Sequence, residues 1–287
     1  MIRTVTVGLD GSPESRAAAE WAAREALRRE LPLRLLNAWE TTAYPVLPQD
    51  DERTYRYWAE RLPREAAESL RSRHPRLEIS YEQRTGAPAE VLADAAARSE
   101  LLVIGSRGLG SVAGFFIGSV AQATVARAEC PVVLVRPGNV LAEPPAPDVV
   151  LGLDLDDAAE ELLAFAFDTA ARHEAPLRVV HCWRVPPVYG FSPSTIAPGV
   201  AAIMAEDANR ALADALAPWR SKYPGVVVRE QAVMGRPARQ LVKAGYDASL
   251  VIVGRRIRAS RAGARIGPVT HALMHHAVAP LAVVPHA

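Results

Sequence analysis

The chain is a tandem repeat, and this feature restricts its possible folds more than any other. The segment Leu33–Glu40 aligns with Leu177–Arg184 at an offset of 144 residues. Asp10 aligns with Asp154 at the same offset, whereas later landmarks align at an offset of 149: Gly86 with Gly235, Gly105 with Gly254, Gly118 with Gly267 and Pro131 with Pro280. Each copy is therefore expected to fold as one unit of about half of the 287 residues.

The change of offset places five extra residues in the second copy, between Arg184 and Gly235. The stretch rich in Pro, Gly and Ser at Pro186–Gly199 is their expected location. Between the copies, Pro137–Pro147 contains four prolines in eleven residues, which is typical of a semi-rigid linker. We therefore predict a first domain at residues 1–137, a linker at 138–147 and a second domain at 148–287.

Within one copy, short apolar strands alternate with helices of amphipathic spacing. This alternation implies right-handed βαβ crossovers and a mainly parallel sheet of about five strands. The fold class is α/β, with two tandem doubly wound domains, and ligands in such sheets bind where the strand order reverses. In the first copy we expect strands at Thr4–Leu9, Leu33–Trp39, Leu77–Gln83, Leu101–Gly105 and Val132–Val135, and helices at Ser15–Arg29, Trp58–Ser72, Ala87–Arg98 and Gly118–Ala128.

Composition excludes several function classes. With 33 Lys+Arg and 32 Asp+Glu the net charge is +1, so a protein that coats nucleic acid is not expected. No stretch approaches the roughly 18 consecutive apolar residues of a membrane span. Cys130 and Cys182 form neither a disulfide framework nor a metal cluster. We expect a cytoplasmic chain that binds neither nucleic acid nor membrane.

A glycine-rich segment follows the fourth expected strand and precedes a helix. Gly105 and Gly108 are separated by two residues, and nine residues then precede Gly118-Ser119. Such glycines let backbone amides approach phosphate oxygens, and the free N–H groups of a helix N-terminus attract an anion. Arg107 adds positive charge. The spacing alone is equally consistent with a glycine-rich turn that binds nothing.

The spacing of this segment resembles the ATP-binding signature of the universal stress protein family. Val7–Pro13, Leu102–Gly108 and Cys130–Val135 support the resemblance, which covers nearly the whole chain, once per copy. It implies an adenine nucleotide alpha hydrolase-like fold with strand order 3-2-1-4-5 and ATP at the point where that order reverses. Mg accompanying the ATP is left open.

The resemblance also assigns candidate nucleotide-binding residues. Asp10 matches an adenine-contacting aspartate, and Ala38 matches a small apolar position beside the adenine. The remaining positions match the signature: Gly105, Arg107, Gly108, Gly118, Ser119 and Val120. Ala121 stands where some ATP-binding members carry a second hydroxyl, which puts one phosphate or metal contact in doubt.

The second copy keeps only part of this signature. Asp154, Gly254, Gly267, Val269 and Thr270 are its candidate residues. Ile257 replaces the second glycine, and Pro268 removes both a hydroxyl and a backbone donor. We expect this site to be impaired for ATP, the alternative being compensation by the Thr270 hydroxyl and by the arginines at positions 255, 256, 258, 261 and 265.

Other constellations point to no catalysis. His271 and His275 lie one helical turn apart but lack the glutamate and third ligand of a zinc site, so a helix face beside the sheet is favoured over a metal pair. Tyr44, Tyr55, Tyr57 and Trp58 cluster in the expected loop after the second strand. They are interpreted as that loop's own small core, with a cover for a nucleotide or a partner surface as the alternative.

The expected function is that of an ATP-binding stress-response regulator with an unidentified protein partner and no fast catalytic turnover. Two alternatives remain open: a scaffold that needs no nucleotide, and a slow ATPase or autophosphorylating protein. Both final strands, Val132–Val135 and Leu281–Val284, are short and apolar. If the family's strand order holds, each lies at a sheet edge, and we expect them to pair antiparallel as an intramolecular pseudo-dimer. A homodimer of whole chains remains open.

Overall fold

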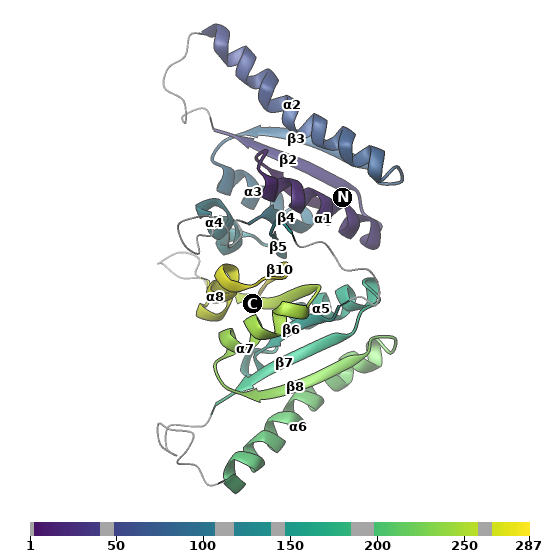
Figure 1. Cartoon of the computed structure of the whole chain (residues 1–287), viewed down its shortest axis with the longest axis vertical. Coiled ribbons are helices and arrows are strands. Elements are labelled where there is room, and N and C mark those ends of the chain that lie inside the picture. Colours follow the sequence, from purple (N-terminus) through teal and green to yellow (C-terminus); the bar gives the residue numbers. More distant parts are fainter. Residues whose placement is uncertain (1–2, 41–48, 107–117, 139–146, 185–197, 258–265) are drawn as a thin grey trace. The chain divides into compact units, whose positions relative to one another are not determined.

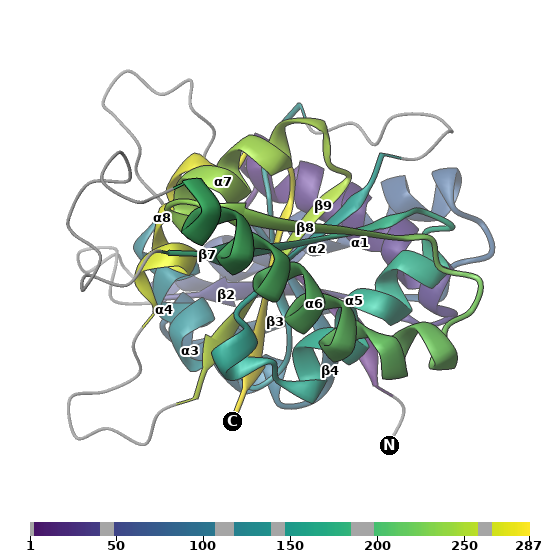
Figure 2. The same cartoon turned by 90° about the horizontal axis from the view of Figure 1, so that it is seen from below.

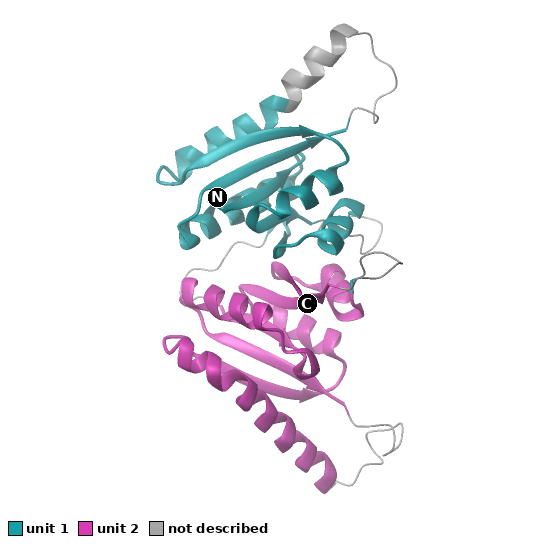
Figure 3. Ribbon diagram, turned by 180° about the vertical axis from the view of Figure 1, so that it is seen from behind, with its two compact units in different colours: residues 1–140, 258–266 teal, residues 141–257, 267–287 magenta. Residues whose placement is uncertain are grey.

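The computed structural model describes residues 3–40, 49–106, 118–138, 147–184, 198–257 and 266–287, without the side chains of residues 49–59 and 198. The chain forms two compact units, one built on residues 1–140 and the other on residues 141–257 and 267–287 (Figure 3). Each unit contains one copy of the sequence repeat, so the duplication in the sequence is a duplication of structure.

In the described part of the first unit, strands and helices alternate (Figure 1). The expected strands Thr4–Leu9, Leu33–Trp39 and Val132–Val135 have the predicted bounds, and the other elements shift by one or two residues, except for the start of the second helix. The elements are β1 (Thr4–Leu9), α1 (Pro13–Arg29), β2 (Leu33–Trp39), α2 (Gln49–Arg73), β3 (Ile79–Thr85), α3 (Pro88–Ala96), β4 (Ser99–Gly105), α4 (Ser119–Arg127) and β5 (Val132–Val135).

The second unit repeats this order with two short 3₁₀ helices added. Its elements are β6 (Val149–Leu153), η2 (Leu155–Asp157), α5 (Glu160–Arg172), β7 (Leu177–Trp183), α6 (Pro198–Lys222), β8 (Val228–Met234), α7 (Pro237–Ala244), η5 (Gly245–Asp247), β9 (Leu250–Arg256), α8 (Pro268–His276) and β10 (Leu281–His286).

Both units have the predicted strand order. The first is ordered β3-β2-β1-β4-β5 and the second β8-β7-β6-β9-β10, with parallel pairing at each of these steps. The order reverses between β1 and β4, and between β6 and β9. The α/β class and the 3-2-1-4-5 order are therefore confirmed, and each unit has one point where a ligand crevice is expected.

Helices cover both faces of each sheet, which is why the central strands are mostly apolar. In the first unit α1 and α2 pack together on one face and α3 and α4 on the other. The second unit has α5 with α6 and α7 with α8 in the same arrangement (Figure 2). The strands β1 and β4 are buried along nearly their whole length, since a parallel sheet between two helix layers exposes neither face.

The five-residue insertion lies where the repeat offset places it. Residues 40–48 connect β2 to α2, and residues 184–197 connect β7 to α6, a connection five residues longer. The helices α2 and α6 that follow both have 25 residues. The two copies therefore differ in this connection and not in the helix after it.

The predicted start of α2 was wrong. The helix begins at Gln49, nine residues before Trp58, so Tyr55, Tyr57 and Trp58 are helical rather than part of an irregular loop. Tyr44 lies outside the described residues. The early segment has no apolar stripe to mark it as helical, but adding residues to an existing helix costs far less than nucleating one.

Two elements of the second unit also differ from the repeat pattern. β10 continues two residues past the predicted end at Val284, because β9 extends to Arg256 and pairs with His286. α5 begins at Glu160, and the preceding residues Leu155–Asp157 form the 3₁₀ turn η2. At the offset of 144, Asp157 stands at the position of Pro13, the first residue of α1. The second unit thus has a different backbone at the loop after its first strand.

Candidate functional site

The first unit contains a cavity of about 390 Å³ at the carboxyl ends of β1, β2 and β4. Six of the eight residues predicted for this unit line it: Asp10, Ala38, Gly105, Gly118, Ser119 and Val120. Arg107 and Gly108 lie outside the described residues. Residues from separate places in the sequence therefore meet around one space at the predicted point in the sheet.

The loop after β1 is held by its own polar side chains. The backbone N–H of Ser12 donates to Asp10 Oδ1 at 3.0 Å, and the Ser12 hydroxyl donates to the same oxygen at 2.5 Å. Ser12 also caps α1, because its hydroxyl oxygen accepts from the Ser15 N–H at 3.1 Å. Gly11 between them has φ +81°, a left-handed conformation that favours glycine. The sequence of this loop thus fixes the Asp10 carboxylate at the mouth of the cavity.

Two effects act on the pKa of Asp10. Partial burial raises it, but the hydrogen bonds from the side chain and backbone of Ser12 and from Ser15 lower it more, so the pKa lies below the ordinary value of 3.8. Asp10 is therefore ionised at neutral pH. An ionised carboxylate accepts hydrogen bonds and donates none, which suits it to an amino group rather than to a phosphate.

The two described signature glycines in this unit have different reasons to be glycine. A Cβ on Gly105 would lie 2.6 Å from the backbone carbonyl carbon of Glu14 and 2.7 Å from the Ser15 nitrogen, so close packing of α1 against β4 excludes a side chain there. A Cβ on Gly118 would meet no atom of the described residues within 4 Å, and the φ of Gly118 is −59°. The packing of α1 against β4 therefore requires glycine at position 105, whereas the described residues leave room for a side chain at position 118.

The N-terminus of α4 faces this cavity through its first residues, Ser119, Val120 and Ala121. Gly118 is the N-cap residue and supplies no side-chain bond to the first turn. N–H groups of a first helical turn lack intrahelical partners, and together with the helix dipole they favour an anion. Ala121 adds no second hydroxyl, as the sequence indicated.

Sequence reasoning missed the apolar wall of the cavity. Leu36, Pro88 and Leu92 line it beside Ala38 and are named by no motif. The repeat held a usable signal, because the corresponding residues Val180, Pro237 and Leu241 also line a cavity in the second unit. These wall positions require only an apolar side chain of suitable size, so no single residue type marks them in the sequence.

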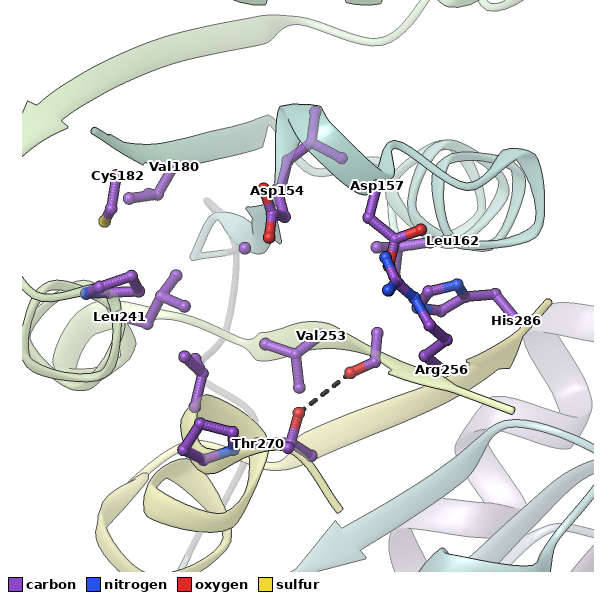
Figure 4. A pocket seen from close by; sticks show the side chains of 17 residues that line it. Asp154, Asp157, Leu162, Val180, Cys182, Leu241, Val253, Arg256, Thr270 and His286 are labelled. Carbon is purple, nitrogen blue, oxygen red and sulfur yellow. Dashed lines mark hydrogen bonds and ion pairs between the residues drawn. The ribbon is translucent and has the colours of Figure 1, made fainter. Parts of the chain in front are cut away.

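The second unit has an equivalent cavity of about 250 Å³ (Figure 4). All five residues predicted for it line this space: Asp154, Gly254, Gly267, Val269 and Thr270. Cys182 stands in the wall at the position of Ala38. Burial raises the pKa of its thiol, so the side chain is uncharged at neutral pH.

Hydrogen bonds within the unit occupy two of the groups that were candidates for compensating the lost signature, the Thr270 hydroxyl and the Arg256 guanidinium. The Thr270 hydroxyl donates to the Gly254 carbonyl at 3.0 Å. Arg256 Nε donates to Asp157 Oδ2 at 2.8 Å. Arg255 is buried, and this burial lowers the pKa of its guanidinium. Arg258, Arg261 and Arg265 lie outside the described residues.

The histidines of α8 make a small cluster of their own. The rings of His271 and His275 have centroids 4.7 Å apart. Within the described parts of the chain, no group of three or more His, Cys, Asp and Glu side chains is arranged to hold a metal ion. Nor does any described helix have the length and apolar character needed to cross a membrane.

Comparisons with known proteins agree with this architecture. The family model described as the universal stress protein family matches twice, at residues 1–136 and 147–285. The universal stress protein Rv2005c of Mycobacterium tuberculosis is 33% identical, with 97% of this chain and 96% of that protein covered. The universal stress protein Rv2623 of the same organism is 32% identical, with 97% and 95% covered.

A solved structure shows the same fold over the whole length. The crystal structure of a universal stress protein from Archaeoglobus fulgidus matches with a TM-score of 0.71 at 16% identity, covering 99% of this chain and 98% of that one. Two family-model matches together span nearly the whole chain, one over each structural repeat. The chain belongs to the universal stress protein family.

Proposed function

We propose that the first unit binds ATP and that the chain acts in the cytoplasm as an ATP-dependent stress-response regulator. One observation carries the proposal: Asp10, Ala38, Gly105 and the segment Gly118–Val120, chosen from separate sequence motifs, line one cavity of about 390 Å³. A glycine-rich turn that binds nothing would have no reason to gather these residues around a space.

The two ends of the cavity suit the two ends of the nucleotide. Leu36, Ala38 and Leu92 offer apolar contact to a flat base, and the ionised Asp10 offers an acceptor for its amino group. The first turn of α4 offers unpaired N–H groups, and Ser119 a hydroxyl, to the phosphates. No atom of the described residues lies within 4 Å of a Cβ placed on Gly118, which leaves room for phosphate oxygens to approach the backbone there.

Regulation would follow from the position of the glycine segment. Residues 106–118 join β4 to α4, and both elements contribute to the cavity. A bound triphosphate would favour one conformation of this segment and so bias the surface offered to a protein partner. Mg would accompany the phosphates, and no described side chain is assigned to it.

The test is nucleotide content and stoichiometry. We expect the purified chain to retain an adenine nucleotide, seen by absorbance and mass spectrometry, and calorimetry to give about one strong ATP site per chain. Gly108→Val should abolish this site, because it adds bulk where the signature brings backbone to phosphate. A chain with no ATP affinity would support a nucleotide-independent scaffold, and metal-dependent phosphate release would support a slow ATPase.

The assembly of the two units is proposed to use the last strands, β5 and β10, paired antiparallel. In the parallel ladder between β4 and β5, Leu102 N–H donates to the Pro131 carbonyl and Ser106 N–H to the Val135 carbonyl. The register Leu102↔Val132 and Ile104↔Leu134 then directs the N–H groups of Val133 and Val135 to β4. The N–H groups of Val132 and Leu134 point the other way, toward the edge.

Amide exchange in the wild-type chain therefore gives a direct measurement of this pairing. We expect slow exchange at Val132 and Leu134 if β10 covers the edge, with Val133 and Val135 as internal controls protected by β4 in either case. Leu134→Pro should loosen the two units by removing an edge donor, whereas Val133→Pro would break the first unit's own sheet. Fast exchange at Val132 and Leu134 beside protected controls would contradict the pairing.

A further inference from the structure

The cavity of the second unit keeps an apolar end like that of the first. Val180, Cys182 and Leu241 stand at the repeat positions of Leu36, Ala38 and Leu92 and line the second cavity. Asp154 stands at the position of Asp10. This end retains both the apolar lining and the carboxylate acceptor of the first unit.

The opposite end has lost donors that a phosphate would need. Pro268 is the first residue of α8, at the position of Ser119, and it has neither a hydroxyl nor an N–H. The hydroxyl of Thr270 donates its proton to the Gly254 carbonyl at 3.0 Å. The helix N-terminus of the second unit therefore presents fewer free donors to an anion than that of the first.

A carboxylate already occupies the basic group at this end. Asp157 Oδ2 accepts from Arg256 Nε at 2.8 Å and lies 2.5 Å from a second guanidinium nitrogen. His286 Nε2 is 3.9 Å from the same oxygen. Figure 4 shows Asp157, Arg256 and His286 gathered at one side of the cavity, with Cys182, Val180 and Leu241 at the other.

This ion pair exists because the backbone after β6 differs from that after β1. Asp157 ends the 3₁₀ turn η2, at the position where Pro13 begins α1. Arg256 stands at the position of Arg107, the basic residue of the first signature. A phosphate entering here would have to displace one carboxylate oxygen from the guanidinium and would meet the like charge of Asp157.

We propose that the second cavity binds a purine nucleoside without phosphates, the Asp157 carboxylate taking the place that a phosphate would hold against Arg256. That the nucleoside is a purine rests on the function proposed for the first unit, because the second cavity repeats the apolar residues and the aspartate that are proposed to hold the base there. The smaller volume, about 250 Å³ against about 390 Å³, agrees with a ligand that lacks a triphosphate. The chain thus distinguishes two forms of the same ligand, nucleotide in one unit and nucleoside in the other.

The test uses the full chain and a matched pair of filling variants, with adenosine and ATP as probes. Ala38→Phe fills the base end of the first cavity, and Cys182→Phe fills that of the second. We expect the Ala38→Phe chain to bind about one adenosine by calorimetry and to bind ATP at least tenfold more weakly. Adding Cys182→Phe should remove the adenosine site. Equal or tighter binding of ATP in the Ala38→Phe chain would overturn the proposal, as would adenosine binding that survives in the double variant.

A second variant tests the ion pair without filling the cavity. In the Ala38→Phe background, Asp157→Asn removes the carboxylate charge beside Arg256 and should raise ATP affinity about tenfold, with adenosine affinity unchanged. Asp156→Asn is the matched control, because its exposed carboxylate makes the same change of charge outside the cavity lining. If Asp157→Asn left the ratio of adenosine affinity to ATP affinity unchanged, this result would contradict the role proposed for the Asp157–Arg256 pair.

The failure of this proposal and that of the ATP proposal are distinguishable. The Cys182→Phe chain keeps the first cavity intact, so its ATP affinity reports on the first unit alone. Loss of ATP binding there concerns the proposed function, whereas absence of adenosine binding in the Ala38→Phe chain concerns the second cavity. Circular dichroism of each variant confirms that both units remain folded.

Discussion

Replacing Ser119 by Pro should weaken ATP binding to the chain by about 100-fold or more, whereas Ser119→Ala should weaken it about tenfold. A hydrogen bond to a charged group contributes about 1.5–3 kcal/mol, and each 1.4 kcal/mol is a factor of ten. Alanine removes only the hydroxyl of Ser119, but proline removes the backbone N–H as well. Calorimetry on both variants measures the difference.

The structure predicts that this proline leaves the fold intact. Gly118 has φ −59° and ψ 140°, the extended backbone that a residue before proline adopts, and Ser119 is the first helical residue, where proline is favoured. The second unit already contains this arrangement, with Gly267 at φ −65° and ψ 157° before Pro268. Equal affinities of the alanine and proline variants would show that the N–H of Ser119 makes no contact with the nucleotide.

Gly105→Ala should destabilise the first unit by about 3 kcal/mol, the upper end of what overpacking costs. The new Cβ would lie 2.6 Å from the carbonyl carbon of Glu14 and 2.7 Å from the nitrogen of Ser15. These are backbone atoms at the start of α1, so relief requires the helix to move away from β4. Denaturant unfolding should show a lower midpoint for the first unit.

The repeat supplies the control for this variant. A Cβ on Gly254 would also meet close atoms, but the nearest are His286 Nε2 at 2.7 Å and Cδ2 at 2.9 Å, which belong to a side chain and not to the backbone. Gly254→Ala should therefore cost about 1 kcal/mol, the lower end of the overpacking range. Equal losses of unfolding free energy in the Gly105→Ala and Gly254→Ala variants would show that the start of α1 yields to the new Cβ as easily as the His286 ring does.

Where sequence and structure disagree, the reason is local. The start of α2 was missed because residues 49–57 carry no apolar periodicity, and helix extension depends on the turn that follows rather than on burial. The apolar wall of Leu36, Pro88 and Leu92 was missed because a sequence motif specifies particular residue types, whereas these positions require only apolar side chains of suitable size. Strand β5 was found with its correct bounds because Val132–Val135 is an unbroken apolar run, which a buried parallel strand favours.

The sequence by itself determined the duplication, the α/β class and the places along the chain where a ligand site could form. Strand periodicity, glycine spacing and repeat offsets are properties of the order of residues, so they can be read without coordinates. The strand order came from the family resemblance, and the pairing of the strands confirmed it.

Only the tertiary structure decided how the two sites differ in their contacts. The sequence showed Asp157, Arg256 and Thr270 as separate residues, and the arginine and the hydroxyl were both candidates for binding phosphate. Folding places the Asp157 carboxylate 2.8 Å from Arg256 Nε and the Thr270 hydroxyl 3.0 Å from the Gly254 carbonyl. Asp157 and Arg256 are 99 residues apart in the chain. Whether such side chains meet depends on the path of the backbone between them, which no local pattern specifies.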